Sequence, residues 1–253
     1  MPVRNEGINL KIMLKILRAV LEIDHEVLVV CDDPADTSIP VVQEMQQAYP
    51  NLHLVLNKYG RGVTNALRAG VDAAQGEYIL IFAADEVGPV LAIEDMLELL
   101  RQGAEFVSCT RYAHGGRRLG GSLIGQILSR TANRLFRTFS GCILTDATTG
   151  IKMMRRSVYY QLKLAARPVG WAVAFEMSMK AQSAGLKLGE VPIISVDRLY
   201  GGQSTFRVGP WTIEYLRWFL WGVRHLRTGA GKKPSVLVRP TSEVPLAAQV
   251  KRS

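Results

Sequence analysis

The apolar residues of the first two-fifths of the chain alternate between two spacings. Short, nearly uninterrupted apolar runs, which are typical of buried strands, occupy residues 25–31, 52–56, 78–82 and 104–109. Apolar residues recur at helical spacing before and between these runs, over residues 9–21, 40–49, 61–75 and 89–102. Strands that alternate with helices predict βαβ units, and hence an α/β fold of Rossmann-like type with a mostly parallel sheet flanked by helices.

The later part of the chain has a different texture. A loop rich in glycine and arginine, "RYAHGGRRLGG", comes before predicted helices at residues 122–139, 171–184 and 211–226 and a predicted strand at residues 187–195. From Gly229 onward the chain is rich in proline, lysine, serine and small residues, which predicts a disordered tail. The first strand of the sheet should precede Pro2, so we expect that strand to be missing or truncated.

Charge is unevenly distributed along the chain. The net charge is +9, and the segment from residue 106 to residue 145 contains six arginines and no aspartate or glutamate. Such basic zones suit polyanions, namely phosphates or an anionic membrane face. Nucleic acid is not the expected partner, because aromatic residues are not interleaved with these arginines as they are in a base-stacking groove.

The cysteines and the hydropathy of the chain indicate its compartment. Three cysteines without C-x-x-C spacing argue against a disulfide framework or a zinc site, and for a reducing compartment. The start of the chain is polar and shows no secretory signal. No uninterrupted apolar run reaches the roughly 18 residues of a membrane-spanning helix. We therefore expect a cytoplasmic location.

The stretch "YILIFAADEVGPV" ends a predicted strand with two carboxylates, Asp85 and Glu86. In open α/β sheets the ligand crevice lies outside the carboxyl ends of the strands, so an acidic residue there is a candidate ligand or metal contact. Alternatively, Asp85 or Glu86 only caps the helix that follows. The pattern of this stretch alone leaves both interpretations open.

A series of short motifs resembles one known family in order and spacing. The motifs are "PVRNE", "EVLVVCDDPADTS", "NKYGRGVTNALRAG", "FAAD", "TRYAHGGRR", "SRTAN", "DATTGIKMMRRSV" and "VDRLYGGQSTF". Together they resemble the family-2 glycosyltransferases with the GT-A fold, in the branch of dolichol-phosphate mannose synthases and other polyprenyl-phosphate hexose synthases. The resemblance implies a GT-A domain over residues 1–207, and we expect an amphipathic interfacial helix over residues 208–228 and a disordered tail over residues 229–253.

The resemblance also implies a site for a nucleotide-diphosphate sugar. The residues implied to bind this donor are Pro2, Arg4, Glu6, Asp32, Gly60, Ala84 and Asp85. Asp85 takes the place of the second aspartate of the family's D-x-D motif, which contacts a divalent ion, Mg²⁺ or Mn²⁺, that bridges the diphosphate. The first aspartate of that motif is Ala83 here, so we expect poor metal binding without nucleotide. Asp32 and Gly60 also have a simpler interpretation as turn residues.

The implied acceptor is a polyprenyl phosphate, an anion to which arginine offers bidentate, permanently charged contacts. The residues implied to contact it are Arg117, Arg118, Arg130, Arg198 and Ser204. The implied catalytic residues are Asp85, Arg117, Arg130 and Arg198. Each arginine has the alternative of being a solvated surface residue. The family's lysine after its G-x-S motif is replaced by Thr205, which departs from the pattern.

A phosphate acceptor removes the need for a general base. A phosphate monoester has a second pKa of about 6 and is already a nucleophilic dianion at neutral pH. None of the four histidines forms a convincing pair with a carboxylate in the sequence, so we assign them no catalytic role.

The resemblance implies an inverting glycosyltransferase that moves a hexose from a GDP- or UDP-sugar to a polyprenyl phosphate. One alternative is a glycosyltransferase that acts on a glycan hydroxyl and uses a carboxylate base. A second is a degenerate, non-catalytic domain that binds nucleotide-sugars. A third is a basic nucleic-acid-binding protein, which would show steep salt-dependent binding.

The last predicted helix is rich in aromatic residues beside arginines. Its aromatic residues are Trp211, Tyr215, Trp218, Phe219 and Trp221. This combination is typical of a helix that lies on a membrane surface, so we expect peripheral attachment to the cytoplasmic membrane face. The alternative is that these aromatic side chains pack on the catalytic domain.

Overall fold

Strands and helices alternate through the first half of the chain, as the hydrophobic pattern predicts. The structure is a computed structural model, and it describes residues 1–119, 123–196, 208–226 and 236–238. The strands are β1 (Pro2–Val3), β2 (Val27–Cys31), β3 (Leu52–Leu56), β4 (Tyr78–Ile81), β5 (Phe106–Thr110), β6 (Arg117–Leu119), β7 (Lys152–Arg155), β8 (Leu188–Pro192), β9 (Ile194–Val196) and β10 (Val236–Val238). The helices are α1 (Gly7–Val20), α2 (Ser38–Gln46), α3 (Val63–Ala73), the 3₁₀ turn η1 (Gly88–Ala92), α4 (Ile93–Arg101), α5 (Leu123–Ser140), α6 (Arg156–Gln161), α7 (Ala172–Ser183) and α8 (Val208–Leu226).

The strands form two larger sheets and one small one. The first sheet has the order β1-β2-β3 and is parallel throughout. The second has the order β10-β8-β5-β7-β4, and β7 runs antiparallel to both of its neighbours. Strands β6 and β9 pair with each other in parallel. The mostly parallel α/β arrangement is therefore confirmed, with β7 as an antiparallel strand that the sequence pattern does not predict.

The first strand is short rather than absent. β1 consists of two residues, Pro2 and Val3, which pair in parallel with Val30 and Cys31 of β2. Val3 is buried, so even this short strand contributes a side chain to the core.

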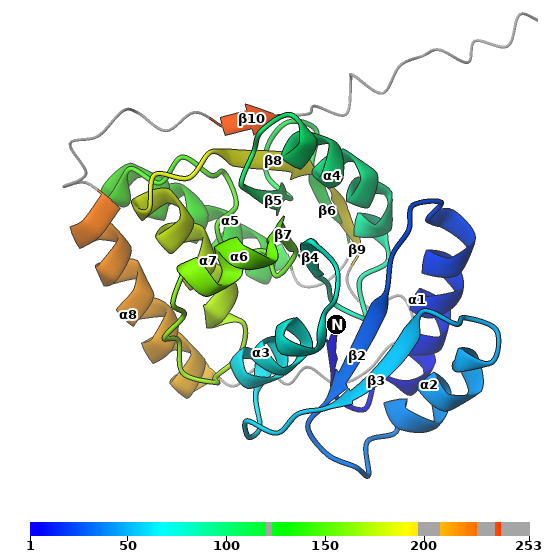
Figure 1. Cartoon of the computed structure of the whole chain (residues 1–253). Coiled ribbons are helices and arrows are strands. Elements are labelled where there is room, and N and C mark those ends of the chain that lie inside the picture. Colours follow the sequence, from blue (N-terminus) through cyan, green and yellow to red (C-terminus); the bar gives the residue numbers. More distant parts are fainter. Residues whose placement is uncertain (120–122, 197–207, 227–235, 239–253) are drawn as a thin grey trace, which may run out of the picture.

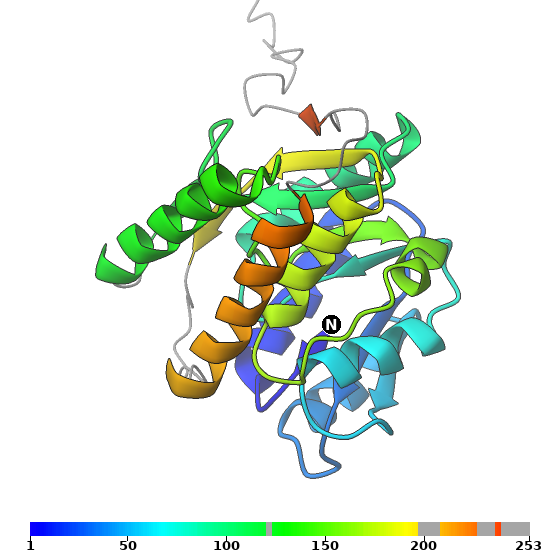
Figure 2. The same cartoon turned by 90° about the vertical axis from the view of Figure 1, so that its left-hand side faces the viewer.

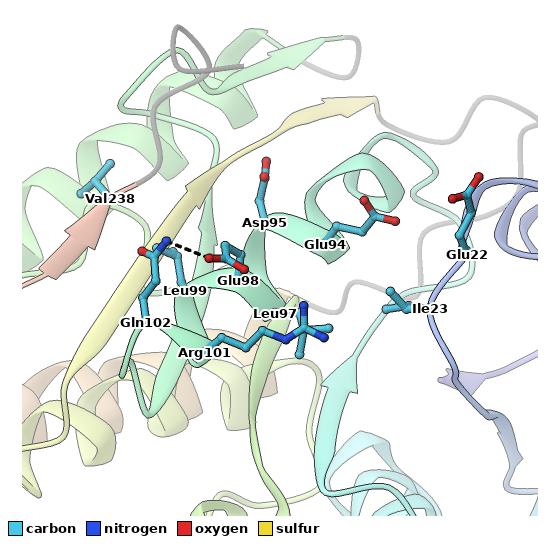
Figure 3. Close-up of a pocket in the computed structure, with 10 residues that line it drawn as sticks. All are labelled: Glu22, Ile23, Glu94, Asp95, Leu97, Glu98, Leu99, Arg101, Gln102 and Val238. Carbon is cyan, nitrogen blue, oxygen red and sulfur yellow. Dashed lines mark hydrogen bonds between the residues drawn. The ribbon is translucent and has the colours of Figure 1, made fainter. Parts of the chain in front are cut away.

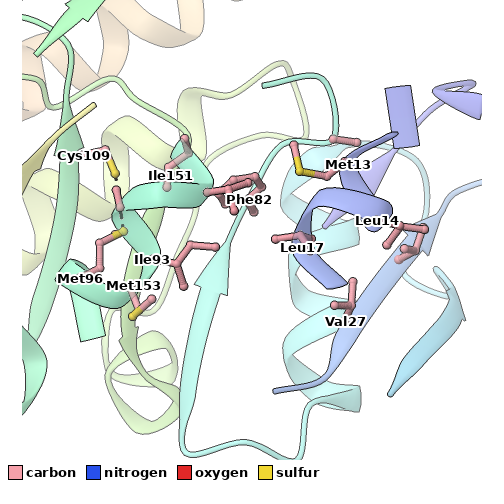
Figure 4. Packing of buried hydrophobic residues seen from close by; sticks show 14 of the residues in the cluster. Met13, Leu14, Leu17, Val27, Phe82, Ile93, Met96, Cys109, Ile151 and Met153 are labelled. Atoms are coloured by element: carbon pink, nitrogen blue, oxygen red, sulfur yellow. Dashed lines mark hydrogen bonds between the residues drawn. The ribbon is translucent and has the colours of Figure 1, made fainter. Parts of the chain in front are cut away.

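Helices cover both faces of the sheets (Figure 1). One buried cluster joins α1, α2, η1 and α4 to one face, and Figure 4 shows Met13 and Leu17 of α1 beside Phe82, with Ile93 and Met96 on the other side. A second cluster joins α3, α5, α6, α7 and α8 to the opposite face. The molecule is therefore a three-layer α/β/α arrangement. α1 buries apolar residues at helical spacing, whereas β2 buries a nearly continuous run. The spacing of apolar residues in each segment therefore agrees with the element that it forms.

The aromatic residues of α8 point toward the domain. Trp218 is buried in the second cluster, and Tyr215, Phe219 and Trp221 are partly buried against it. Phe219 packs on Phe136 of α5 with ring centroids 5.3 Å apart. These aromatic side chains therefore pack on the rest of the domain, as the alternative interpretation expects, and attachment of the helix to a membrane stays a prediction.

A short strand lies within the segment that the composition predicts to be a disordered tail. Val236, Leu237 and Val238 form β10, which pairs in parallel with β8 at the edge of the second sheet. The predicted disorder therefore does not hold for these three residues.

Candidate functional site

The turn after β1 is tied to the loop after β2 through Asp36. The backbone N–H of Asn5 donates to both carboxylate oxygens of Asp36, at 3.1 and 3.0 Å. Asp36 also accepts from the Ser38 backbone N–H at 2.8 Å, and the Ser38 hydroxyl accepts from the Glu6 backbone N–H at 3.0 Å. The backbone around Pro2, Arg4 and Glu6 is thus held against the second strand loop. The Glu6 side chain accepts from Asn9 at 2.9 Å and so takes part in this local network.

Asp32 organises the loop that follows β3. One of its oxygens accepts from the Asn57 side chain at 2.7 Å, and the other accepts from the Gly62 backbone N–H at 2.8 Å. Asn57 in turn donates to the Gly60 carbonyl at 2.7 Å. The structure therefore brings together Asp32 and Gly60, two of the predicted donor-binding residues, through Asn57, which the sequence reasoning did not single out.

The glycines of this loop have backbone conformations that favour glycine. Gly60 has φ of 92° and Gly62 has φ of 118°. A Cβ on Gly62 would lie 2.5 Å from the Pro168 carbonyl oxygen, so the loop approaches the segment before α7 very closely. Glycine at position 62 is therefore required by the contact as well as by the backbone angle.

The carboxylate pair after β4 lies at the carboxyl end of its strand, as predicted. Asp85 and Glu86 are half-buried, whereas Ala84 is buried in the cluster that contains Val3 and Met13. The Ala84 side chain thus belongs to the core. Only its backbone is left to contact a ligand.

The residues present give a limited fit to a divalent ion. Among the residues that the structure describes, no group of three His, Cys, Asp or Glu side chains could hold a metal ion. Mg²⁺ commonly takes one or two carboxylates and completes its shell with phosphate oxygens and water. Asp85 fits that pattern only if a diphosphate supplies further ligands.

The predicted acceptor arginines lie on β6 and α5. Arg117 is exposed, its backbone N–H donates to the Ile193 carbonyl at 2.9 Å, and Arg118 follows it as a half-buried residue. Arg130 is exposed on α5. Arg198 and Ser204 lie outside the described residues.

A buried ion pair holds the connection between β5 and α5. Arg111 contacts Asp146 through two bonds, Nε to Oδ2 at 2.6 Å and Nη2 to Oδ1 at 3.0 Å. Burial acts to raise the pKa of Asp146, but the charge and hydrogen bonds of Arg111 outweigh it and hold that pKa below its ordinary value. The Thr148 hydroxyl bonds to Asp146 at 3.0 Å and accepts from Asn133 of α5 at 3.1 Å.

A further hydrogen bond fixes the same helix. The Tyr112 hydroxyl donates to Ser129 at 2.7 Å, one residue before Arg130. The sequence motifs contain Ser129, Asp146 and Thr148, but their spacing does not reveal that these residues form one network with Arg111 and Tyr112. This network positions the part of α5 that carries Arg130.

One histidine pairs with a carboxylate, contrary to the sequence-based expectation. His114 Nε2 lies 3.9 Å from Glu190 Oε2. Burial raises the pKa of Glu190, which also accepts the backbone N–H groups of Thr145 and Asp146 at 2.6 and 3.2 Å. The two residues are about 75 positions apart in the chain, so only the fold brings them together.

A hollow of about 610 Å³ lies away from these residues (Figure 3). It is lined by α4, by Glu22 and Ile23 before β2, and by Val238 of β10. Arg101 and Gln102 at one end of it precede β5, so the hollow lies toward the amino ends of the strands. The candidate site lies at the opposite, carboxyl ends.

The fold and these strand-end residues define the class of the protein. The chain belongs to glycosyl transferase family 2, since the model of that family matches residues 1–163. The arrangement of strands and helices is that of the GT-A fold.

Two curated relatives share most of this chain. One is a dolichol-phosphate mannosyltransferase from Pyrococcus furiosus, 26% identical over 219 residues, which cover 85% of this chain and 60% of the relative. The other is a polyprenol monophosphomannose synthase from Mycolicibacterium smegmatis, 26% identical over 227 residues, which cover 84% of this chain and 85% of the relative. The chain thus spans 60% of the length of the first relative and 85% of the length of the second.

Solved structures of glucosyl-3-phosphoglycerate synthase from Mycobacterium tuberculosis share the fold. The complex with Mn²⁺, UDP-glucose and phosphoglyceric acid superposes with a TM-score of 0.66 at 16% identity, over 91% of this chain and 80% of that one. A complex of the same enzyme with Mg²⁺ and UDP gives a TM-score of 0.65 at 15% identity, over 91% of this chain and 80% of that one. At this identity the similarity establishes the fold alone.

Proposed function

We propose that this protein transfers a hexose from a GDP- or UDP-sugar to a polyprenyl phosphate, with inversion at the anomeric carbon. The observation that carries the proposal is the contrast between the two sides of the site. A half-buried carboxylate, Asp85, follows β4, while β6 and α5 carry exposed arginines and no acidic residue. The names of the two curated relatives support the same acceptor.

The donor would bind over the loops after β1, β2 and β3. Asp32 and Asn57 hold the β3 loop in a fixed shape, so the backbone of Gly60 can approach the nucleotide without reorganisation. Pro2, Arg4 and Glu6 lie in the neighbouring turn. In this assignment Asp32 acts mainly by ordering the loop, because both of its oxygens already accept hydrogen bonds within the protein.

Asp85 would hold a divalent ion, Mg²⁺ or Mn²⁺, together with the donor diphosphate. Such an ion neutralises charge on the diphosphate as it leaves. The protein needs only one carboxylate for this purpose if the phosphate oxygens supply the remaining ligands.

The acceptor phosphate would be held by arginines. Arg117, Arg118 and Arg130 carry permanent charge and bidentate donors, with Arg198 and Ser204 assigned to the same group from the sequence. Because the acceptor is already an anion, these residues orient it and no general base is required. Attack by the phosphate oxygen forms the new bond to the anomeric carbon as the bond to the nucleotide diphosphate breaks.

A lipid acceptor also sets where the protein works. Residues 1–207 would form the catalytic domain, and residues 208–228 would keep it at the cytoplasmic face of a membrane, with residues 229–253 as a tail. No helix among the described residues is long and apolar enough to cross a bilayer. The attachment we propose is therefore peripheral.

One observation favours a different acceptor. His114 and Glu190 form a pair that could act as a base toward a hydroxyl group, as a glycosyltransferase for glycans would require. Glu190 already accepts several hydrogen bonds within the protein, so this candidate ranks second. The loss of the first D-x-D aspartate at Ala83 would instead suit a domain that binds the donor without turnover.

The test is transfer of label into lipid. Purified protein is incubated with radiolabelled GDP-mannose or UDP-glucose, a divalent ion, and either polyprenyl phosphate or the corresponding dephosphorylated polyprenol. We expect label in the lipid extract with the phosphate and none with the alcohol. Label on the alcohol or on an added glycan, or donor binding with no transfer at all, would overturn the proposal.

A further inference from the structure

The connection between α6 and α7 links two parts of the molecule that are distant in sequence. Residues 165–170 of this connection, which we call the α6–α7 strap, lie outside the helices and strands. Figure 2 shows the connection passing from α6 to the lower end of α7, with α3 in cyan on one side and α8 in orange on the other. The strap therefore lies between α8 and α3, the helix that follows the β3 loop.

The start of the strap is held by a carboxylate buried in α7. Glu176 is 0% exposed, its Oε1 accepts from the Ala165 backbone N–H at 2.6 Å, and its Oε2 accepts from the Ala166 backbone N–H at 2.7 Å. Lys180, one helical turn later, lies 2.7 Å from Oε1. A buried carboxylate needs such partners, because without them its desolvation is costly. Both oxygens of Glu176 are thus committed to the strap.

The middle of the strap is held by a second buried carboxylate, which belongs to α8. Glu214 is 2% exposed, and its Oε1 accepts from the Arg167 backbone N–H and from the Trp218 indole N–H, both at 3.1 Å. A Cβ on Gly170 would lie 2.5 Å from the Trp211 ring, so the end of the strap also approaches α8 closely. Three successive backbone N–H groups therefore donate to two buried carboxylates.

The other side of the strap meets the β3 loop. The Thr64 hydroxyl, in the first turn of α3, donates to the Arg167 carbonyl at 3.4 Å. The Pro168 carbonyl oxygen would lie 2.5 Å from a Cβ on Gly62, whose backbone N–H donates to Asp32 at 2.8 Å. Arg167 thus bonds to α8 through its backbone N–H and to α3 through its carbonyl.

Hydrogen bonds, rather than apolar burial, fix the position of the strap. Of its six residues only Ala166 is buried, and Arg167 and Pro168 are exposed. A segment with few buried apolar contacts opens easily unless its backbone groups are held. The position of the strap against Gly62 therefore depends on Glu176 and Glu214.

We infer that Glu176 and Glu214 are positioning residues for donor binding, which act through the α6–α7 strap to hold the β3 loop in its binding shape. This inference rests on the proposed function, because it takes the loop that carries Gly60 and Gly62 as part of the nucleotide site. It goes beyond that function, because it makes nucleotide affinity depend on two carboxylates of α7 and α8 that lie outside the donor residues.

The test measures nucleotide binding directly. The full chain is titrated with GDP and with UDP in the presence of Mn²⁺ by calorimetry, and a thermal melt is recorded for each variant. Glu214→Ala removes the acceptor of the Arg167 N–H. We expect the Kd of the bound nucleotide to rise roughly threefold to tenfold, since at most the effect of one charge-assisted hydrogen bond reaches the β3 loop.

Glutamine variants separate the two carboxylates. Glu214→Gln keeps one carbonyl oxygen, which is enough because Arg167 and Trp218 both donate to the same oxygen of Glu214. It should bind nucleotide like the wild type. Glu176→Gln should weaken binding as much as Glu176→Ala, because two oxygens of Glu176 accept backbone N–H groups and an amide has only one acceptor oxygen.

Gln182→Ala is the matched control. Gln182 is a buried side chain of the same helix, α7, and it holds a different connection. It accepts from the Ile143 backbone N–H and donates to the Gly141 carbonyl, both at 2.9 Å. Gln182→Ala should lower the melting temperature as Glu214→Ala does and leave the nucleotide Kd unchanged.

Pro168→Gly tests the strap with both carboxylates in place. Pro168 is exposed, so the variant should fold, whereas its backbone gains freedom where the strap meets Gly62. The nucleotide Kd should rise by roughly threefold or more, and this variant decides the matter if Glu214→Ala does not fold.

An unchanged nucleotide Kd in Glu214→Ala or in Pro168→Gly would overturn the inference, as would an equal rise in Gln182→Ala. A wild type that binds neither GDP nor UDP would overturn it as well. Nucleotide binding that weakens in the expected variants, without transfer to any polyprenyl phosphate, would leave this inference standing while the proposed function fails.

Discussion

Asp85 is the residue on which the proposed donor chemistry depends most directly. Asp85→Asn keeps the size of the side chain and removes its charge, so the fold should survive while the divalent ion loses its protein ligand. We expect kcat to fall on the order of 100-fold, the size typical of removing one preorganised electrostatic contact. Steady-state rates across a series of Mn²⁺ concentrations measure this effect.

The control for this variant is Glu94→Gln on α4, which removes an exposed carboxylate from another part of the molecule. It should leave both kcat and the metal dependence unchanged. Wild-type activity of Asp85→Asn at every metal concentration would show that Asp85 only caps the helix that follows.

Arg117 and Arg130 are assigned to the acceptor half of the proposed site. Arg117→Ala and Arg130→Ala should each weaken use of the lipid phosphate by about 1.5–3 kcal/mol, the usual value of a charge-assisted hydrogen bond. The donor KM should change little if these arginines contact the acceptor, as proposed. Separate titrations of donor and acceptor in the transfer assay distinguish the two effects.

Arg101→Ala provides the matched control, since Arg101 is an exposed arginine near the amino ends of the strands. An equal loss of donor affinity in Arg117→Ala would move this arginine from the acceptor phosphate to the donor diphosphate.

At the scale of elements, the close approach of the β3 loop to the segment before α7 should shape the proposed donor loop. Gly62→Ala would place a methyl group 2.5 Å from the Pro168 carbonyl oxygen, so the loop must move and its bond to Asp32 must weaken. We expect the donor KM to rise roughly tenfold, with a smaller effect on kcat, as for loss of a uniform binding contact.

Gly103→Ala separates the clash from backbone strain. Gly103 has φ of 100°, close to that of Gly62, but a Cβ there would meet nothing within 4 Å. It should cost stability in a thermal melt without changing the donor KM. If both variants raise the donor KM equally, the contact with Pro168 does not shape the donor loop.

Strand β7 contains a buried lysine whose charge the fold disfavours. Lys152 is fully buried, and desolvation lowers its pKa from 10.5 to about 8. Between pH 8 and pH 10.5, Lys152 binds more protons in the unfolded chain than in the folded one. The contribution of Lys152 to the free energy of unfolding therefore rises with pH through this range. The slope is at most about 1.4 kcal/mol per pH unit.

Lys152→Met should therefore remove a pH-dependent part of the free energy of unfolding. Urea denaturation at several pH values between 8 and 10.5 measures the difference between the variant and the wild type. The free energy of unfolding of the variant should exceed that of the wild type by most at pH 8, and this excess should shrink as the pH rises. Lys187→Met, at an exposed lysine, should follow the wild type, and a pH-independent difference for Lys152→Met would contradict the assignment.

The hydrophobic period predicts the elements well wherever one period is clear. The predicted strand at residues 52–56 matches β3 residue for residue, and the predicted helix at residues 211–226 differs from α8 only at its start. β7 escapes prediction because Lys152 and Arg155 enclose two methionines, and a buried lysine does not resemble a strand residue in sequence. β10 escapes because its short apolar run lies in a polar segment.

The site is less predictable than the elements. A strand followed by an acidic residue marks Asp85, and a glycine-rich turn marks Gly60. Asn57 donates to the Asp32 side chain, 25 residues away, and Asp36 accepts from the Asn5 backbone N–H, 31 residues away, and no local spacing encodes either contact. Trp218 points inward because α8 packs on α7 and α5. The composition of α8 alone does not show which side of the helix packs on these neighbours.

At the scale of the whole molecule, the proposed donor and acceptor sites belong to different parts of the fold. The three-stranded parallel sheet and its loops provide the proposed nucleotide site. The arginines of β6 and α5 provide the proposed phosphate site. This arrangement would let a nucleotide-sugar enter from solution while the lipid phosphate arrives from a bilayer.

The central claim is that the acceptor nucleophile is a phosphate oxygen. The most direct test is ¹³C and ³¹P NMR of the lipid product formed from an α-linked nucleotide-sugar carrying ¹³C at the anomeric carbon. The account predicts a single β-linked product in which the anomeric carbon couples to one phosphorus. An anomeric carbon without phosphorus coupling, or an α-linked glycosyl phosphate, would contradict it.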